Sequence, residues 1–190
     1  IAIGAYLNGA TGANAGHVRV YKFNSSKTTA NTLGPAGWDK LGGDIDGEAA
    51  GDQSGGNGWD SKSVSISADG TTVAIAALVN DGNGIDSGQV RVYKYNSGKV
   101  SADALGPAGW DKLGADIDGE AANDQSGYAI GLSADGTIVA IGAYANDGVN
   151  GIDSGHVRVY KYTPTKTLAV TVQTDLSFGP IGWNRLGADI

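Results

Sequence analysis

The chain has 190 residues, a formal net charge of −7 and hydrophobic residues at 41% of its positions, which is enough to bury a sizeable core in one domain. Only 13 Lys and Arg stand against 20 Asp and Glu, so the composition argues against nucleic acid or an anionic membrane surface as a partner. The absence of Cys excludes disulfides and thiolate metal sites, and no apolar run approaches the ~20 residues that span a bilayer.

In chain order, the first predicted element is the apolar run IAIGA at 1–5, which is typical of an inner β-strand. HVRVYKF at 17–23 follows, and its alternating pattern predicts a second strand. A short strand is then expected around Trp38, in the motif GPAGWDKLGGDIDGEAAGDQSG at 34–55. Because chain termini normally lie in polar segments and this chain opens in an apolar one, we expect it to be a piece of a longer polypeptide.

The later elements repeat the first ones at offsets of about 70 residues, which is typical of a tandem repeat. The second copy comprises a hairpin at 64–67 and 73–77, the strand QVRVYKY at 89–95 and the motif GPAGWDKLGADIDGEAANDQSG at 106–127. The third copy comprises YAIGLS at 128–133, TIVAIGA at 137–143, HVRVYKY at 156–162 and GPIGWNRLGADI at 179–190. Each copy therefore predicts a meander of four short antiparallel strands.

A sheet of this kind has apolar residues on both faces of its inner strands, so it must stack on its neighbours. The predicted fold class is all-β, with consecutive four-stranded blades of a β-propeller and an open stack of the same sheets as the alternative. The blades are expected at 1–63, which lacks its first strand, at 64–127 and at 128–190. We expect this segment to associate, aggregate or stay partly unfolded when expressed alone, rather than to behave as a monomer, because its terminal sheets lack neighbours.

The cycle SGYAIGLSADGTIVAIGAYANDGVNGIDSGHVRVYKY resembles the FG-GAP repeats of integrin α-subunit propellers and their bacterial and algal relatives. The shared features are a small-residue strand ending in Gly-Ala, a loop, and a Gly-x-Val-x-Val-Tyr strand. The resemblance implies propeller blades. That family carries an Asp-rich calcium loop between the first two strands, whereas this chain has only Ser-Ala-Asp-Gly at 67–70 and 133–136.

Two acidic segments are the candidate metal ligands. They are Asp44, Asp46 and Glu48 in the first copy and Asp116, Asp118 and Glu120 in the second. Carboxylates at alternate positions around a Gly turn suit Ca²⁺, which takes 6–8 oxygen ligands. Two interpretations stay open, because Asp-Gly turns between strands also form without a metal.

His17 and His156 occupy equivalent positions, but the second copy has Gln89 there. We therefore expect a polar role at the end of the strand rather than imidazole chemistry. The paired carboxylates of the acidic segments argue against glycoside hydrolysis, because they recur in both copies whereas catalysis happens once per fold.

The candidate ligand-binding residues are Trp59 and Asn57, which lie in six extra residues at 55–60 of the first copy. A Trp held by glycines is suited to stack on a sugar ring or to anchor a protein partner, and it could equally fold over an exposed blade edge. Trp38, Trp110 and Trp183 recur in every copy, so they are interpreted as packing residues. A further insertion at 163–177 is expected to cover an edge or pair with a neighbour.

Asn24, in Asn-Ser-Ser, fits the rule for N-glycosylation. Together these features predict a non-enzymatic extracellular or cell-surface scaffold for structure or adhesion, within a larger surface or filamentous assembly. The expected partners are neighbouring blades or subunits of the same protein. A carbohydrate-binding, lectin-like propeller, assisted by Ca²⁺, is the alternative.

Overall fold

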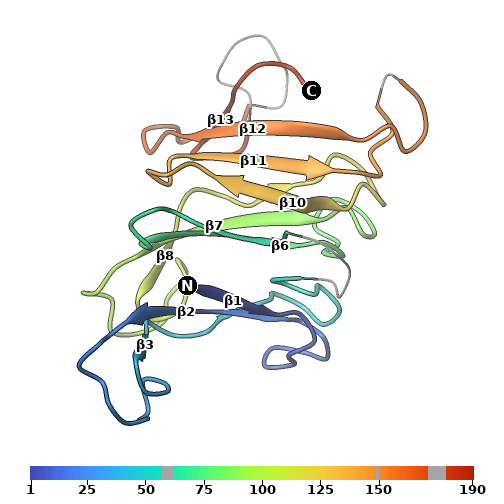
Figure 1. Ribbon diagram of the computed structural model, residues 1–190. Coiled ribbons are helices and arrows are strands. Elements are labelled where there is room, and N and C mark those ends of the chain that lie inside the picture. Colours follow the sequence, from blue (N-terminus) through green and yellow to red (C-terminus); the bar gives the residue numbers. More distant parts are fainter. Residues whose placement is uncertain (57–61, 149, 171–178) are drawn as a thin grey trace.

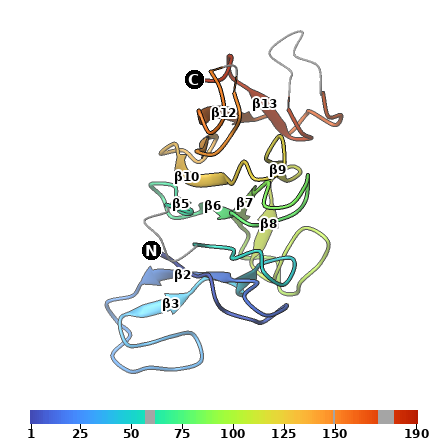
Figure 2. The ribbon, with the colours of Figure 1, turned by 90° about the vertical axis from the view of Figure 1, so that its right-hand side faces the viewer.

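The computed structural model describes residues 1–56, 62–148, 150–170 and 179–190. These residues form thirteen β-strands and no helix, so the all-β prediction is confirmed, and they contain no helix able to cross a bilayer. The strands make three antiparallel sheets that follow one another in chain order and lie as successive layers (Figure 1). The side view in Figure 2 shows the same order, from β2 and β3 to β12 and β13.

The first sheet is built around one long central strand. Its strands are β1 (Ala2–Ala5), β2 (His17–Phe23), β3 (Trp38–Lys40) and β4 (Ile45–Asp46). β2 pairs with β1 along one edge, and along the other edge it pairs first with β4 and then with β3. The apolar alternation of β2 places Val18 and Val20 on one face, where both are buried.

The second and third sheets repeat this plan and add the opening strand that the first sheet lacks. The second sheet consists of β5 (Val64–Ile66), β6 (Thr72–Ala77), β7 (Gln89–Tyr95), β8 (Trp110–Lys112) and β9 (Ile117–Asp118). The third consists of β10 (Ser126–Leu132), β11 (Ile138–Ala143), β12 (His156–Tyr162) and β13 (Trp183–Arg185). The three repeated tryptophans occupy one register position, opposite Phe23, Tyr95 and Tyr162.

The acidic segments, expected as loops, contain the short strands β4 and β9. Asp-Ile-Asp has the period of a strand, and the isoleucine points into the core while its neighbours face outward. Ile45 is 1% exposed and Ile117 is 2% exposed. The pairing of Ile45 with Val18, and of Ile117 with Val90, therefore fixes where the acidic side chains lie.

The two apolar cores lie between successive sheets. The front face of a sheet is defined here as the side that carries its tryptophan, and the back face as the side that carries the two valines of its central strand. In the first core, Val18, Val20 and Ile45 on the back face of the first sheet meet the front face of the second sheet. The front-face residues of this core are Val73, Ile75, Tyr93 and Trp110. The second core repeats the arrangement between the second and third sheets.

At each joint, a tryptophan indole of the following sheet donates a hydrogen bond to the backbone of the preceding sheet. Trp110 Nε1 donates to the backbone oxygen of Leu41 at 3.0 Å, and Trp183 Nε1 donates to that of Leu113 at 2.9 Å. Both tryptophans are fully buried. This confirms that they share one environment, whereas Trp38, on the front face of the first sheet, is half-buried.

The three sheets do not close on themselves within the part of the chain that is described. Consecutive opening strands approach each other, and Lys62 forms a parallel bridge with Ala129. The structure thus establishes several stacked antiparallel sheets, and no propeller ring is seen.

Candidate functional site: the acidic joint between the first two sheets

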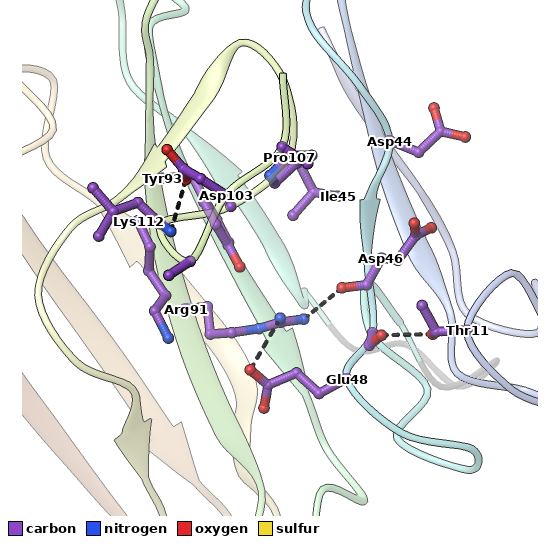
Figure 3. Close-up of a pocket in the computed structure, with 15 residues that line it drawn as sticks. Thr11, Asp44, Ile45, Asp46, Glu48, Arg91, Tyr93, Asp103, Pro107 and Lys112 are labelled. Carbon is purple, nitrogen blue, oxygen red and sulfur yellow. Dashed lines mark hydrogen bonds and ion pairs between the residues drawn. The ribbon is translucent and has the colours of Figure 1, made fainter. Parts of the chain in front are cut away.

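The acidic segment of the first sheet faces a pocket at the joint with the second sheet. The pocket has a volume of about 440 Å³. The first sheet contributes Asp44, Asp46, Glu48 and neighbouring residues, and the second sheet contributes Arg91, Tyr93, Lys112 and the segment 102–107. Figure 3 shows Arg91 extending from the second sheet between Glu48 and Asp46. The predicted metal ligands of the first copy therefore line one pocket.

Asp44 is held by two cations of its own sheet. Arg19 donates from Nε to both carboxylate oxygens at 3.0 Å and from Nη2 to Oδ2 at 2.8 Å, while Lys40 Nζ donates to Oδ1 at 2.7 Å. The hydrogen bonds from Arg19, helped by Lys40, hold the pKa of the Asp44 carboxyl well below its usual range. Its charge is thus already compensated by the protein.

Asp46 of β4 lies directly opposite the buried His17 of β2 in the strand pairing. His17 Nδ1 is 3.9 Å from Asp46 Oδ1 and 4.0 Å from Asp44 Oδ2. His17 Nδ1 and Asp46 Oδ1 are both buried, and neither makes a hydrogen bond to the described residues. The imidazole therefore sits at the end of its strand, as expected, but against two carboxylates that the sequence did not assign to it.

Glu48 reaches across the joint to the second sheet. Its Oε1 lies 3.4 Å from Arg91 Nη1, and Gln89 Nε2 donates to its Oε2 at 3.3 Å. Arg91 also donates from Nη2 to the backbone oxygen of Asp46 at 2.9 Å. Arg91 is 5% exposed, so this cation is buried, whereas the side chain of its partner Glu48 is 43% exposed.

The second copy of the segment repeats two of these contacts, from its glutamate to an arginine of the next sheet and from its first aspartate to a lysine of its own sheet. Glu120 pairs with Arg158 of the third sheet and lies 3.9 Å from His156 Nδ1. Asp116 accepts from Lys112 Nζ at 2.8 Å. Burial raises the pKa of Asp118, against a hydrogen bond from Gln89 that lowers it. The contact between the glutamate and the arginine of the next sheet is therefore made at both joints.

Neither predicted set of three metal ligands converges. Among the described residues, the one group of three whose ligand atoms lie within 4.8 Å of one another is Glu120, His156 and Asp189. Arg158 contacts both carboxylates of this group, and Arg185 contacts Asp189. Cations of the protein thus occupy the positions next to these oxygens, and Ca²⁺ binding stays a prediction.

A second pair of buried polar contacts also crosses the joints. Asn80 Nδ2 donates to Asp52 Oδ2 at 3.2 Å, and Asn146 Nδ2 donates to Asp124 Oδ2 at 2.9 Å. All four residues are at most 6% exposed. The aspartate that begins each DQSG motif thus accepts a hydrogen bond from an asparagine of the next repeat.

The other predicted site residues are placed as follows. Asn57 and Trp59 lie outside the described residues, as does much of the insertion at 163–177. Asn24 Nδ2 donates to Asp39 Oδ2 at 2.6 Å, and Asn24 Oδ1 accepts from the Ser26 backbone at 3.0 Å. Asn96 makes the matching bonds in the second repeat, where no glycosylation motif exists. The geometry gives Asn24 a role in its turn, and its glycosylation stays a prediction.

Sequence reasoning missed the arginines of the central strands, which proved to be the main partners of the acidic segments. The signal was present, because Val-Arg-Val recurs in all three copies and Asp-Ile-Asp-Gly-Glu in two of them. Opposite charges repeated in register predict ion pairs between or within repeats.

Comparison with protein-family profiles, with curated proteins and with solved structures gives no match. The resemblance to FG-GAP repeats therefore rests on the motifs in the sequence alone.

Proposed function

We propose that the chain is a non-enzymatic structural or adhesion scaffold of propeller-type repeats, which acts outside the cell or on its surface within a larger assembly. The observation that carries the proposal is the duplication of the polar joint. Glu48 with Arg91 recurs as Glu120 with Arg158. The glutamate of each acidic segment is thus paired with the next sheet, and its first aspartate is paired with a lysine of its own sheet.

The electrostatics of the joint support this role. A nucleophile or general base needs a side chain that is open to substrate and has a pKa matched to its task. Asp44 is instead saturated by Arg19 and Lys40, and Arg91 is buried between Glu48 and the Asp46 backbone. These contacts stabilise the stack of sheets, which is the property that a scaffold requires.

The propeller arrangement is part of the proposal. Four-stranded antiparallel sheets, stacked face to face with their opening strands adjacent, are the building plan of propeller blades. An open stack of the same sheets is the alternative arrangement. Small-angle scattering from a longer chain of these repeats distinguishes the two, because a ring keeps a compact radius of gyration whereas a stack lengthens with each repeat.

A parallel screen tests the non-enzymatic role. Wild type, Glu48→Gln and the matched Glu120→Gln are assayed with glycosidic, ester and phosphoester substrates, and their unfolding in denaturant is followed. We expect no turnover, and destabilisation of about 0.5–1 kcal/mol by each substitution, as for partly exposed ion pairs. Turnover that Glu48→Gln abolishes and Glu120→Gln retains would refute the scaffold role.

A carbohydrate-binding function is the second candidate, because the pocket of about 440 Å³ falls in the usual size range of ligand sites. The carboxylates of Asp46 and Glu48 supply acceptors for sugar hydroxyls, and Lys112 supplies a donor. A glycan array probed with and without Ca²⁺ tests it. Binding that is lost in both Glu48→Gln and Trp59→Ala would support this candidate, and a blank array would remove it.

A further inference from the structure

The two ends of the stack carry the indole and apolar parts of the joint that is made twice inside it, whereas the third copy of the acidic segment, at 187–190, has no counterpart of Glu48 or Asp52. Among the described residues, no sheet lies against the front face of the first sheet or against the back face of the third. Ile3 is 49% exposed, whereas its equivalent Ile75 is 1% exposed. Val157 is 39% exposed, whereas its equivalent Val90 is fully buried. Each exposed face therefore presents residues that are buried at the equivalent positions of an internal joint.

The donor half of the joint is already formed around Trp38. Its ring meets Phe23 edge-on, with centroids 5.4 Å apart, as Trp110 meets Tyr95 at 5.3 Å. Lys27 Nζ donates to the Trp38 backbone oxygen at 2.7 Å, matching the bond at 2.8 Å that Lys99 makes to Trp110. Trp38 Nε1 has no hydrogen bond to the described residues, so the indole is positioned to donate to a further sheet.

The acceptor half is formed at the other end, at Leu186 and Gly187. Leu186 N donates to the Val159 oxygen at 2.7 Å, as Leu113 N does to the oxygen of Val92 at the internal joint. Gly187 has φ +76°, close to the +69° of Gly114. A Cβ on Gly114 would lie 2.7 Å from the indole nitrogen of Trp183, whereas a Cβ on Gly187 would meet nothing within 4 Å. The turn thus has the conformation that receives an indole, with the space still open.

We propose that a second copy of this chain docks head to tail, with the front face of its first sheet on the back face of the third sheet and its Trp38 indole donating to the Leu186 backbone oxygen. The proposal rests on the scaffold function and names its partner. Such a contact is heterologous, because each copy uses one face to give and the other to receive. Copies therefore add one after another by continuing the joint already present inside the chain.

Complementation between two blocked variants tests the proposal. Trp38→Ala removes the indole at one end. Gly187→Asn fills the receiving turn at the other end with a residue that tolerates positive φ. The control is Gly70→Asn, since Gly70 has φ +72° and open space but lies in the turn between β5 and β6. Mass is measured against concentration by light scattering and sedimentation, with circular dichroism to confirm folding.

Wild type and Gly70→Asn are expected to form a concentration-dependent series of oligomers. For each blocked variant alone, the affinity of association should fall by at least about 30-fold, as when a central buried anchor is removed. An equimolar mixture of the two should form dimers, because the intact front face of Gly187→Asn can dock on the intact back face of Trp38→Ala. Growth should stop there, because the two faces left at the ends of the dimer are the blocked ones. A monomeric wild type, a blocked variant that associates like wild type, or a mixture that does not pair would overturn the proposal. None of these results bears on turnover, so the scaffold role is judged separately by the substrate screen.

Discussion

Substituting Gly114 with alanine tests the joint between the second and third sheets in the most demanding way. The new Cβ would lie 2.6 Å from the Ile181 oxygen and 2.7 Å from Trp183 Nε1. Positive φ costs a non-glycine residue about 1–2 kcal/mol, overpacking costs about 1–3 kcal/mol and a lost hydrogen bond costs about 1 kcal/mol. Allowing for overlap among these effects, we expect destabilisation of about 3–5 kcal/mol.

The matched control for this experiment is Gly70→Ala. Gly70 has a similar φ of +72°, but a Cβ there meets nothing within 4 Å, so only the backbone strain of about 1–2 kcal/mol remains. The assay is equilibrium unfolding in urea at a protein concentration where association is absent, read by tryptophan fluorescence. Equal destabilisation by Gly114→Ala and Gly70→Ala would refute the close packing of the joint.

Three further outcomes are expected. Trp110→Phe should lower the free energy of unfolding by about 1–3 kcal/mol because it leaves the Leu41 oxygen in the joint without its donor, whereas Trp38→Phe should change it by less than about 0.5 kcal/mol; urea unfolding measures both. The lowered pKa of Asp44 means that its contribution to stability is complete above the unfolded pKa of about 4 and is lost as the pH falls further. Melting temperatures between pH 6 and pH 2 should therefore fall less steeply for Asp44→Asn than for wild type, and parallel curves would contradict this. If the acidic segments bind Ca²⁺, calorimetric titration should give heat and a chelator should lower the melting temperature; absence of both would exclude the metal.

The strands could be predicted because their periodicity is local. Alternation in 156–162 and the apolar run in 137–143 are set by which side chains are buried, and the repeat makes each assignment three times over. The packing role of Trp110 and Trp183 followed from their recurrence in every copy. The structure adds the reason for that recurrence, which is the backbone oxygen that each indole reaches in the preceding sheet.

The partners of the acidic residues could not be predicted from local sequence. Asp44 and Arg19 are 25 residues apart, and they meet because β4 pairs with the first half of β2. Glu48 and Arg91 belong to different sheets, so their contact depends on how the sheets stack. Charge spacing within the segment indicated a cation site, and only the tertiary arrangement supplied the arginines that now occupy it.

Matched double-mutant cycles test whether the same polar joint is built twice. The pair Asp52 and Asn80 spans the first joint, and Asp124 and Asn146 span the second. Each residue is replaced by alanine singly and in its pair, and unfolding free energies are measured in urea. We expect a favourable coupling of about 0.5–3 kcal/mol in both cycles, equal within about 0.5 kcal/mol. A coupling found at only one joint, or at neither, would contradict it.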